Sequence, residues 1–197
     1  MITFPIDPFR YDHGFVSDAK NIVYFDLETQ RTANDVGGWD KKADMGVSIG
    51  VTYSTASGSY EIFTENRVGE LIDLLSRADL VVGYNSRRFD YEVLMGYTIL
   101  DLPHHLPTLD LLEVVEKAAG HRLSLDSIAT ATLGVGKTAD GLDAIRWWRE
   151  GKILEIAEYC CFDVKVTKMV HEYAEKHGEL HFVDRFSRRQ TLKVELP

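Results

Sequence analysis

Two acidic side chains stand at the end of an apolar segment near the start of the chain. The segment reads NIVYFD over residues 21–26 and continues with LET, which places carboxylates at Asp26 and Glu28. A short run of β-branched and aromatic residues predicts a buried strand, and alternate residues of a strand point to one face. Two like charges on one face raise each other's pKa unless a cation lies between them. The segment therefore indicates either a strand end that meets water or a metal site.

Strand patterns dominate the first part of the chain, and strand–helix pairs follow. Residues 46–55 and 59–64 flank ASG and predict a hairpin, and residues 79–85 predict another buried strand. Helices are predicted at residues 66–78, 91–95, 124–134, 140–151 and 152–178, and residues 106–120 predict a strand that continues as a helix. Residues 29–45 are interpreted as a polar loop, and the tail from residue 179 as a small hairpin. This order predicts an α/β fold, a mixed sheet with helices packed on it.

Length and charge narrow the class of protein. The 197 residues suffice for one domain with a proper core, and no linker or repeat divides them, so we expect a single domain over residues 1–197. Lys and Arg number 22 against 31 Asp and Glu, a net charge of −9, which argues against a protein that coats nucleic acid through its overall charge. This net charge does not exclude an enzyme with a local basic groove. Bound divalent cations would also offset part of the negative charge of an acidic site.

The chain lacks signals that would take it to a membrane, and we expect a cytoplasmic location. No apolar stretch is long enough to cross a bilayer. The N-terminal segment lacks the basic start and apolar core of a signal peptide. The adjacent Cys160 and Cys161 match no zinc spacing and are interpreted as packing thiols.

Two further acids occupy suggestive positions. Asp90 follows GYNSRRF, just past the end of a predicted strand, and sites in α/β sheets collect at the carboxyl ends of strands. Asp163 lies in the longest predicted helix, and Tyr159, four residues earlier, shares its face. Acids from three separated segments can thus converge with Asp26 and Glu28.

Converging carboxylates need cations. At about 4 Å two unit charges repel by about 4 kcal/mol at an effective dielectric near 20. Ligands that are all oxygen suit hard ions such as Mg²⁺ or Mn²⁺. Two such ions about 3.5–4 Å apart clamp the attacking and leaving oxygens of a phosphodiester; one lowers the pKa of a bound water, and the other steadies the departing 3′ oxygen. The acid set therefore predicts two divalent cations and phosphodiester hydrolysis.

Three stretches carry a family resemblance. FDLET, GYNSRRFD and YCCFD, in this order, resemble the three exonuclease motifs of the DEDDy 3′→5′ exonucleases of the ribonuclease H-like superfamily. The most similar group is the predicted exonucleases related to the proofreading domain of family B DNA polymerases. The resemblance covers residues 21–177 or so, and leaves residues 1–20 and 178–197 as extra packing elements or partner surfaces. It implies a five-stranded sheet with an antiparallel second strand, flanked by helices, which the hairpin predicted after Gly46 fits.

The resemblance also implies roles for single residues. The water-activating metal would be held by three carboxylates: Asp26, Glu28 and Asp163. Asp26 would bridge to a second metal, with Asp90 contributing there, often through water. Tyr159 matches the motif tyrosine that orients the attacking water, and Glu158 stands where the sister subfamily has a His. The chain is therefore placed in the tyrosine branch.

Four residues near the acids are candidates for substrate binding. Asn85 can hydrogen-bond the substrate backbone or serve as a turn residue. Arg87 and Arg88 are of the type that pairs with phosphate, although exposed arginines are common. Trp39 can stack on a base or pack onto the domain. Asp110 stands at a strand-to-helix junction, where an N-cap role is favoured over an outer role near the metals.

We therefore predict a metal-dependent 3′→5′ exonuclease that acts on nucleic acid with a free 3′ end, with DNA favoured over RNA. Two rival hypotheses stay open. The sheet of this superfamily also hosts structure-selective endonucleases. A nucleic-acid-binding module with an idle site is the third hypothesis, and the intact acid set argues against it.

Overall fold

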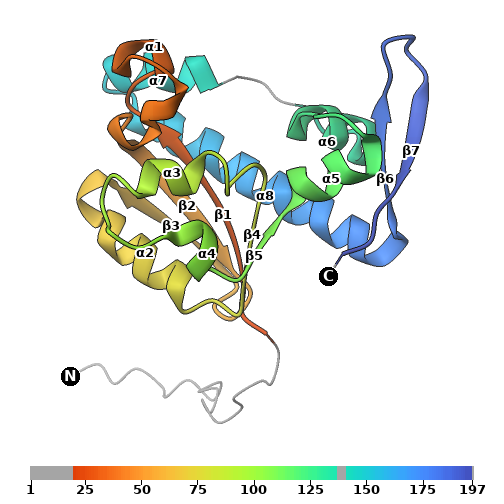
Figure 1. The fold of residues 1–197 in the computed structure, drawn as a ribbon, viewed down its shortest axis with the longest axis horizontal. Helices are drawn as coiled ribbons and strands as arrows, with labels where there is room; N and C mark the ends of the chain where they lie inside the picture. The colour runs from red at the N-terminus through yellow and green to blue at the C-terminus, as the bar shows by residue number, and fades with distance from the viewer. Residues whose placement is uncertain (1–19, 137–140, 197) are drawn as a thin grey trace, which may run out of the picture.

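A mixed five-stranded sheet runs through the centre of the molecule (Figure 1). The computed structural model describes residues 20–136 and 141–196 of the chain. The strands of the sheet are β1 (Ile22–Thr29), β2 (Val47–Ser54), β3 (Ser59–Thr64), β4 (Leu80–Gly83) and β5 (Thr108–Asp110). Their order is β3-β2-β1-β4-β5, and β2 runs antiparallel to both of its neighbours while β1, β4 and β5 are parallel. The predicted fold class is confirmed.

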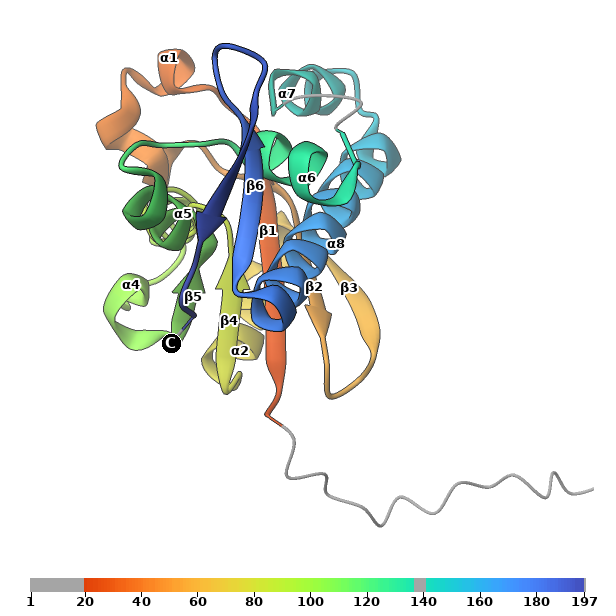
Figure 2. The same ribbon diagram turned by 90° about the vertical axis from the view of Figure 1, so that its right-hand side faces the viewer.

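Helices cover both faces of this sheet (Figures 1 and 2). One face carries α2 (Val68–Ser76), α3 (Asp90–Leu94) and α4 (Leu102–His105), and a short 3-10 turn η2 (Glu65–Arg67) leads into α2. The other face carries α5 (Leu111–Ala119), α6 (Leu125–Leu133), α7 (Gly141–Arg149) and α8 (Ile153–His177). The structure is therefore a three-layer sandwich with α8 as its longest element.

Two segments differ from the prediction. Residues 29–45, predicted as a polar loop, contain α1 (Ala33–Val36) and the 3-10 helix η1 (Trp39–Asp44). The Thr32 hydroxyl accepts from the Asp35 N–H at 3.1 Å, and the Asp35 carboxylate accepts from the Thr32 N–H at 2.8 Å, which forms a capping box. The one-turn helix α4 was not predicted either, because a single turn carries too few residues to show a helical period.

The register of β1 decides where its acids go. Alternate residues fill the apolar core on the α2 side of the sheet: Val23, Phe25 and Leu27. Tyr24 fills the core on the α8 side, and Asp26 and Glu28 continue its face. A slip of one residue would drive Asp26 into the α2-side core and is therefore excluded by the apolar side chains.

The end of α8 follows the predicted pattern. Gly178 adopts a φ of 64° and its N–H donates to the Ala174 carbonyl at 2.8 Å, so the helix stops where a residue without a Cβ permits it. The tail then forms the antiparallel hairpin of β6 (Glu179–Val183) and β7 (Arg189–Lys193), as predicted, and the hairpin packs on α5, α6 and α8 (Figure 2).

Two expectations concern the ends and surroundings of the chain. Residues 1–19 lie outside the described residues, so the roles of that segment and the single-domain extent over residues 1–197 stay predictions. Within the part of the chain that the structure describes, no helix combines the length and the apolar character that crossing a bilayer requires.

A buried polar pair joins β1 to α8. The Tyr24 hydroxyl lies 2.9 Å from Nδ1 of His171, and both side chains are buried. Burial lowers the pKa of His171 below its usual value, so the ring is neutral at pH 7. Because Nε2 of His171 faces Oε1 of Glu175 at 3.8 Å, Nδ1 is the acceptor of the Tyr24 hydroxyl.

Tyr24→Phe is expected to lower the free energy of unfolding by about 1–3 kcal/mol, because Nδ1 of His171 is left buried without its donor. The matched control is Tyr53→Phe, at a half-buried tyrosine of β2 whose hydroxyl bonds to no residue in ranges 20–136 and 141–196. The control should change stability by less than about 0.5 kcal/mol. Urea unfolding measures both, and equal losses would contradict the role of the buried pair.

Candidate active site

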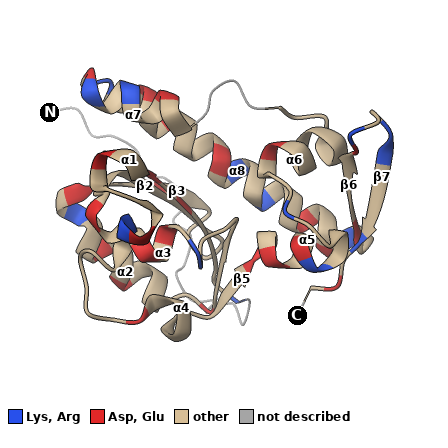
Figure 3. Ribbon diagram, turned by 45° about the horizontal axis from the view of Figure 1, so that its top comes forward, with Lys and Arg blue, Asp and Glu red and all other residues tan. Residues whose placement is uncertain are grey.

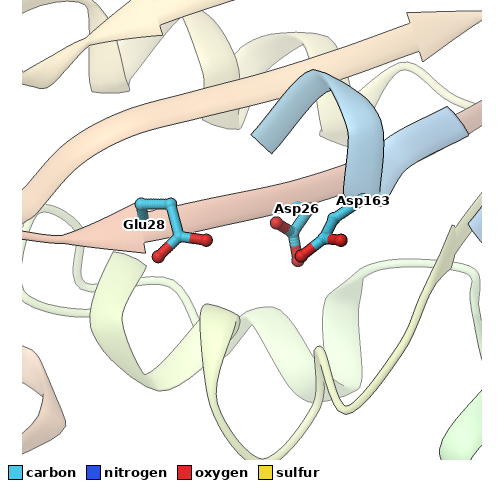
Figure 4. A group of neighbouring side chains, drawn as sticks. All are labelled: Asp26, Glu28 and Asp163. Atoms are coloured by element: carbon cyan, nitrogen blue, oxygen red, sulfur yellow. The ribbon is translucent and has the colours of Figure 1, made fainter. Parts of the chain in front are cut away.

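Three carboxylates meet where β1 runs beside α8. Asp26 and Glu28 project from β1 and Asp163 projects from α8, all into the same space (Figure 4). One carboxylate oxygen of each lies within 4.8 Å of the others. The pairing of β1 with β2 shifts register between Glu28 and Thr29, an irregularity of the kind that re-aims side chains beside sites. The fold thus brings together three acids that are far apart in sequence.

The face of α8 that carries Asp163 also carries Tyr159. Tyr159 is largely buried, and the Trp147 ring of α7 packs edge-on against it at a centroid distance of 6.1 Å. Between Tyr159 and Asp163 in the sequence, Cys160 donates through its Sγ to the Asp26 carbonyl at 3.4 Å. Cys160 and Cys161 are free thiols, and Cys160 packs in the core as predicted while also tying α8 to β1.

Asp90 begins α3 and contacts the same strand from another side. Its Oδ1 accepts from the Leu27 N–H at 3.2 Å, and the side chain is buried. Burial, and after it the charge of Asp26, raises the pKa of Asp90 well above its usual value. The fourth predicted acid therefore lies beside the group of three, in its electrostatic field.

The chemistry of these acids fits a divalent cation. Two unit charges at the observed separations repel by about 3–4 kcal/mol at an effective dielectric near 20. The donor set consists of carboxylate oxygens alone, which is the set that Mg²⁺ and Mn²⁺ prefer over softer metals. Asp26, Glu28 and Asp163 could hold one ion. Asp90 lies close enough to Asp26 for the charge of Asp26 to raise its pKa, so these two carboxylates could hold a second ion.

Asp110 organises the loop that leads from β4 to Asp90. Its Oδ1 accepts from the N–H groups of Asn85 at 2.7 Å and Leu112 at 3.0 Å, and its Oδ2 from the N–H of Arg87 at 3.0 Å. The predicted N-cap role of Asp110 is confirmed, since it caps α5. The same carboxylate fixes the turn in which Asn85 takes a left-handed φ of 72°, a conformation that Asn tolerates better than most residues.

A cavity of about 680 Å³ opens over the acids. All five predicted catalytic residues line it, and so do Asn85 and Trp39. Trp39 is 67% exposed and its ring packs edge-on against Phe89 at a centroid distance of 6.4 Å. The Trp39 ring therefore lines the cavity and also contacts the body of the domain through Phe89, and base stacking by Trp39 stays a prediction.

The two predicted phosphate-binding arginines lie elsewhere. The Arg87 guanidinium donates to the carbonyls of Pro103 at 2.5 Å and Thr108 at 2.9 Å, which ties α4 to β5. Arg88 forms an ion pair with Glu116 at 2.8 Å. Neither side chain lines the cavity. Phosphate binding by Arg87 or Arg88 stays a prediction, and these contacts give both side chains a structural explanation instead.

One wall of the cavity, formed by α7, was not predicted from the sequence. Leu142 and Ile145 of α7 line it, and Leu142 is 69% exposed. Asp35 of α1 pairs with Arg149 of α7 at 2.8 Å, so the β1–β2 connection and α7 lie side by side (Figure 1). No local sequence pattern indicates the contact between Asp35 and Arg149, which are 114 residues apart. The T-x-x-D spacing that begins at Thr32 could have predicted α1.

Comparison with known proteins agrees with this architecture. A solved structure of similar fold is the family B DNA polymerase from the hyperthermophilic archaeon Pyrobaculum calidifontis, with a TM-score of 0.61 and 17% sequence identity. The match covers 80% of this chain and 25% of the polymerase chain, so the chain spans about a quarter of that polymerase, and at this identity the likeness concerns the fold. A comparison with curated proteins gave no match.

The family itself is decided by a match of the sequence. Residues 23–175 match the RNase H superfamily, which is most of the chain and includes all the predicted catalytic residues. The superfamily and the polymerase group are those that the three motifs resemble, so the resemblance is confirmed. This chain belongs to the RNase H superfamily, a superfamily of nucleases.

Proposed function

We propose that the protein is a metal-dependent 3′→5′ exonuclease that hydrolyses phosphodiester bonds at the 3′ end of nucleic acid. The observation that carries the proposal is the convergence of Asp26, Glu28 and Asp163 within 4.8 Å, beside a cavity of about 680 Å³. Membership of a nuclease superfamily supports hydrolysis of nucleic acid. Tyr159, on the same face of α8 as Asp163, supports the tyrosine branch of 3′→5′ exonucleases.

Each functional side chain has a proposed task. When bound, Mg²⁺ or Mn²⁺ ions supply a water of lowered pKa and stabilise negative charge on the departing 3′ oxygen. Asp26, Glu28 and Asp163 would hold one ion, and Asp26 together with Asp90 would hold the other. Tyr159, whose ring is packed against Trp147, donates a hydrogen bond that orients the attacking water.

The rim of the cavity supports binding of an unpaired end. Trp39 offers an exposed ring on which a base can stack, and such stacking tolerates any sequence because every base has a π-face. The Asn85 side chain lines the same cavity, and its Oδ1 has no hydrogen-bond partner among the described residues. DNA is favoured over RNA on the resemblance to exonucleases of DNA polymerases.

Mg²⁺ or Mn²⁺ is expected to raise the melting temperature, because a cation that binds only the folded state stabilises it. At a concentration of 100 Kd the gain is about 2.7 kcal/mol, or about 5–10 °C for a chain of this size. Asp26→Asn should lose most of this rise and should melt above the wild type in EDTA, since one of the repelling charges is gone.

The matched control for metal binding is Asp73→Asn, which removes an exposed acid of α2. It should keep the wild-type response to both metals in a thermal melt followed by circular dichroism. A wild-type protein that does not respond to either metal would contradict the cation site, and so would an undiminished response in Asp26→Asn.

Hydrolysis of a 5′-labelled single strand should require Mg²⁺ or Mn²⁺, stop in EDTA and shorten the strand from its 3′ end. Blocking the 3′ end should stall the reaction, whereas an endonuclease would cut the blocked strand. The rates of hydrolysis of single-strand DNA, duplex DNA and RNA measure the substrate preference. Cuts inside the blocked strand would favour the endonuclease hypothesis, and hydrolysis of no substrate with either metal would favour the idle module.

Tyr159→Phe is expected to lower kcat by about 10–100-fold, the size of a lost hydrogen bond to a reacting group. Asp26→Asn is expected to lower kcat by more than about 1000-fold, because it removes a charged ligand that both metals would share. Single-turnover rates at saturating substrate separate these effects from binding. Equal losses in the two variants would contradict the assigned roles.

A further inference from the structure

A cluster of arginines stands at the tip of the hairpin formed by β6 and β7. The tip, residues 184–189, reads DRFSRR and carries three arginines: Arg185, Arg188 and Arg189. Residues 185–189 are all exposed, and Figure 3 shows the basic residues at this end of the hairpin. On a chain with a net charge of −9, three positive charges within five residues form a local exception.

Asp184 holds the tip in one shape. Its Oδ1 accepts from the N–H groups of Phe186 at 2.8 Å and Arg188 at 3.0 Å. Its Oδ2 accepts from Nε of Arg188 at 3.0 Å and Nε2 of Gln190 at 2.9 Å. These hydrogen bonds, that of the Arg188 N–H first, hold the pKa of Asp184 at about 2, so the turn keeps its anchor throughout the neutral range.

Phe186 spreads two of the arginines around an exposed ring. The side chain is 63% exposed, and the guanidinium carbons of Arg185 and Arg188 lie 4.8 Å and 5.0 Å from the ring centre. The cation–π contact holds the Arg185 guanidinium without neutralising it, whereas the Arg188 guanidinium pairs with Asp184 at 3.0 Å. Arg185 and Arg189 pair with no carboxylate of residues 20–136 and 141–196, so their charge is available to a ligand.

The tip and the acid cluster lie toward the same end of the molecule. Asp26 and Glu28 stand near the carboxyl end of β1. In Figures 1 and 2 the hairpin tip reaches the level of α1 and α7, which lie beyond that end of the sheet. A strand that enters the cavity can therefore extend along this end of the molecule toward the tip.

We propose that the hairpin tip, residues 184–189, is a second nucleic-acid contact that binds the phosphate backbone upstream of the 3′ end. Its place relative to the 3′ end rests on the proposed function, whereas its affinity for nucleic acid does not. Charge complementarity selects this ligand, because unpaired guanidinium groups match phosphate geometry and the exposed ring adds a stacking surface. The tip also supplies local attraction that the acids of the cavity cannot, since those acids repel phosphate.

The test compares two pairs of substitutions of equal charge. Arg185→Ala with Arg189→Ala removes two positive charges at the tip. Lys20→Ala with Arg77→Ala removes two exposed positive charges just before β1 and β4, at the opposite end of the sheet. Binding of a labelled 30-nucleotide single strand is measured by fluorescence anisotropy in EDTA, so that no hydrolysis occurs, at 50 to 200 mM salt.

The tip pair is expected to weaken binding and to lower the slope of log K against log salt by about 1.4, or about 0.7 for each lost phosphate contact. The ratio of the wild-type binding constant to that of the tip pair should then fall about sevenfold between 50 and 200 mM salt. The pair Lys20→Ala with Arg77→Ala should leave the slope unchanged. Phe186→Ala, which keeps the net charge, should also weaken binding, because the arginines lose the ring that arranges them.

Three results would overturn the inference: an unchanged slope in the tip pair, equal losses in both pairs, or a wild-type tip that binds an acidic protein but not nucleic acid. A length series separates this inference from the proposed function. The tip pair should raise KM for long strands at least fivefold while leaving that for a trinucleotide unchanged. A protein that binds strands through the tip but hydrolyses none would contradict only the proposed function. A protein that hydrolyses strands from the 3′ end, and whose tip pair binds and hydrolyses long strands as the wild type does, would contradict only the role of the tip.

Discussion

The site depends on electrostatic repulsion between carboxylates that two packed elements hold together. Asp26 cannot move away from the other carboxylates, because the neighbouring residues of β1 are packed in apolar cores on both faces of the sheet. Four buried apolar side chains of β1 contribute about 1.5–3 kcal/mol each, and their sum of about 6–12 kcal/mol exceeds a repulsion of about 3–4 kcal/mol between two acids. The packing therefore decides the position of the charges, and the unfavourable electrostatic energy remains in the folded state until a cation offsets it.

Asp110 and Asp90 show how the same residue type serves two purposes a short distance apart. Asp110 accepts three main-chain N–H groups and thereby fixes the cap of α5 and the turn at Asn85. Asp90 accepts the Leu27 N–H while burial and the charge of Asp26 disfavour its ionised form. A carboxylate surrounded by donors is a structural element, whereas one that faces another carboxylate has a reason to bind a cation. Asp110 also fixes the turn at Asn85 that leads to Asp90, so an acid with a structural role supports the position of the acid proposed to bind metal.

Local chemistry explains which parts of this architecture were predictable. The strand at Asp26 and the helices predicted over residues 124–134 and 152–178 each depend on residues within a few positions, and the structure has them close to the predicted ranges. The approach of Asp163 to Asp26 follows from topology, since one helix crosses the carboxyl end of one strand. The contacts of Arg87 with Pro103 and the wall formed by α7 depend on pairs that no period or cap records. Side chains that reach across the fold are thus the ones whose roles the sequence left open.

The distribution of charge explains how an acidic chain can hold a polyanion. The net charge of −9 opposes association at long range, and the acids of the cavity oppose it most where the chemistry would occur. Cations bound in the cavity would offset the charge of its acids only locally, because at physiological salt the field of an ion fades within about 8 Å. Attraction beyond that distance must come from positive side chains that project from the body of the protein. Arg88, on the body of the protein, pairs with Glu116, whereas Arg185 and Arg189 at the hairpin tip pair with no carboxylate of the described residues. The extension after α8 therefore adds exposed guanidinium groups, those of Arg185 and Arg189, that pair with no carboxylate of the described residues.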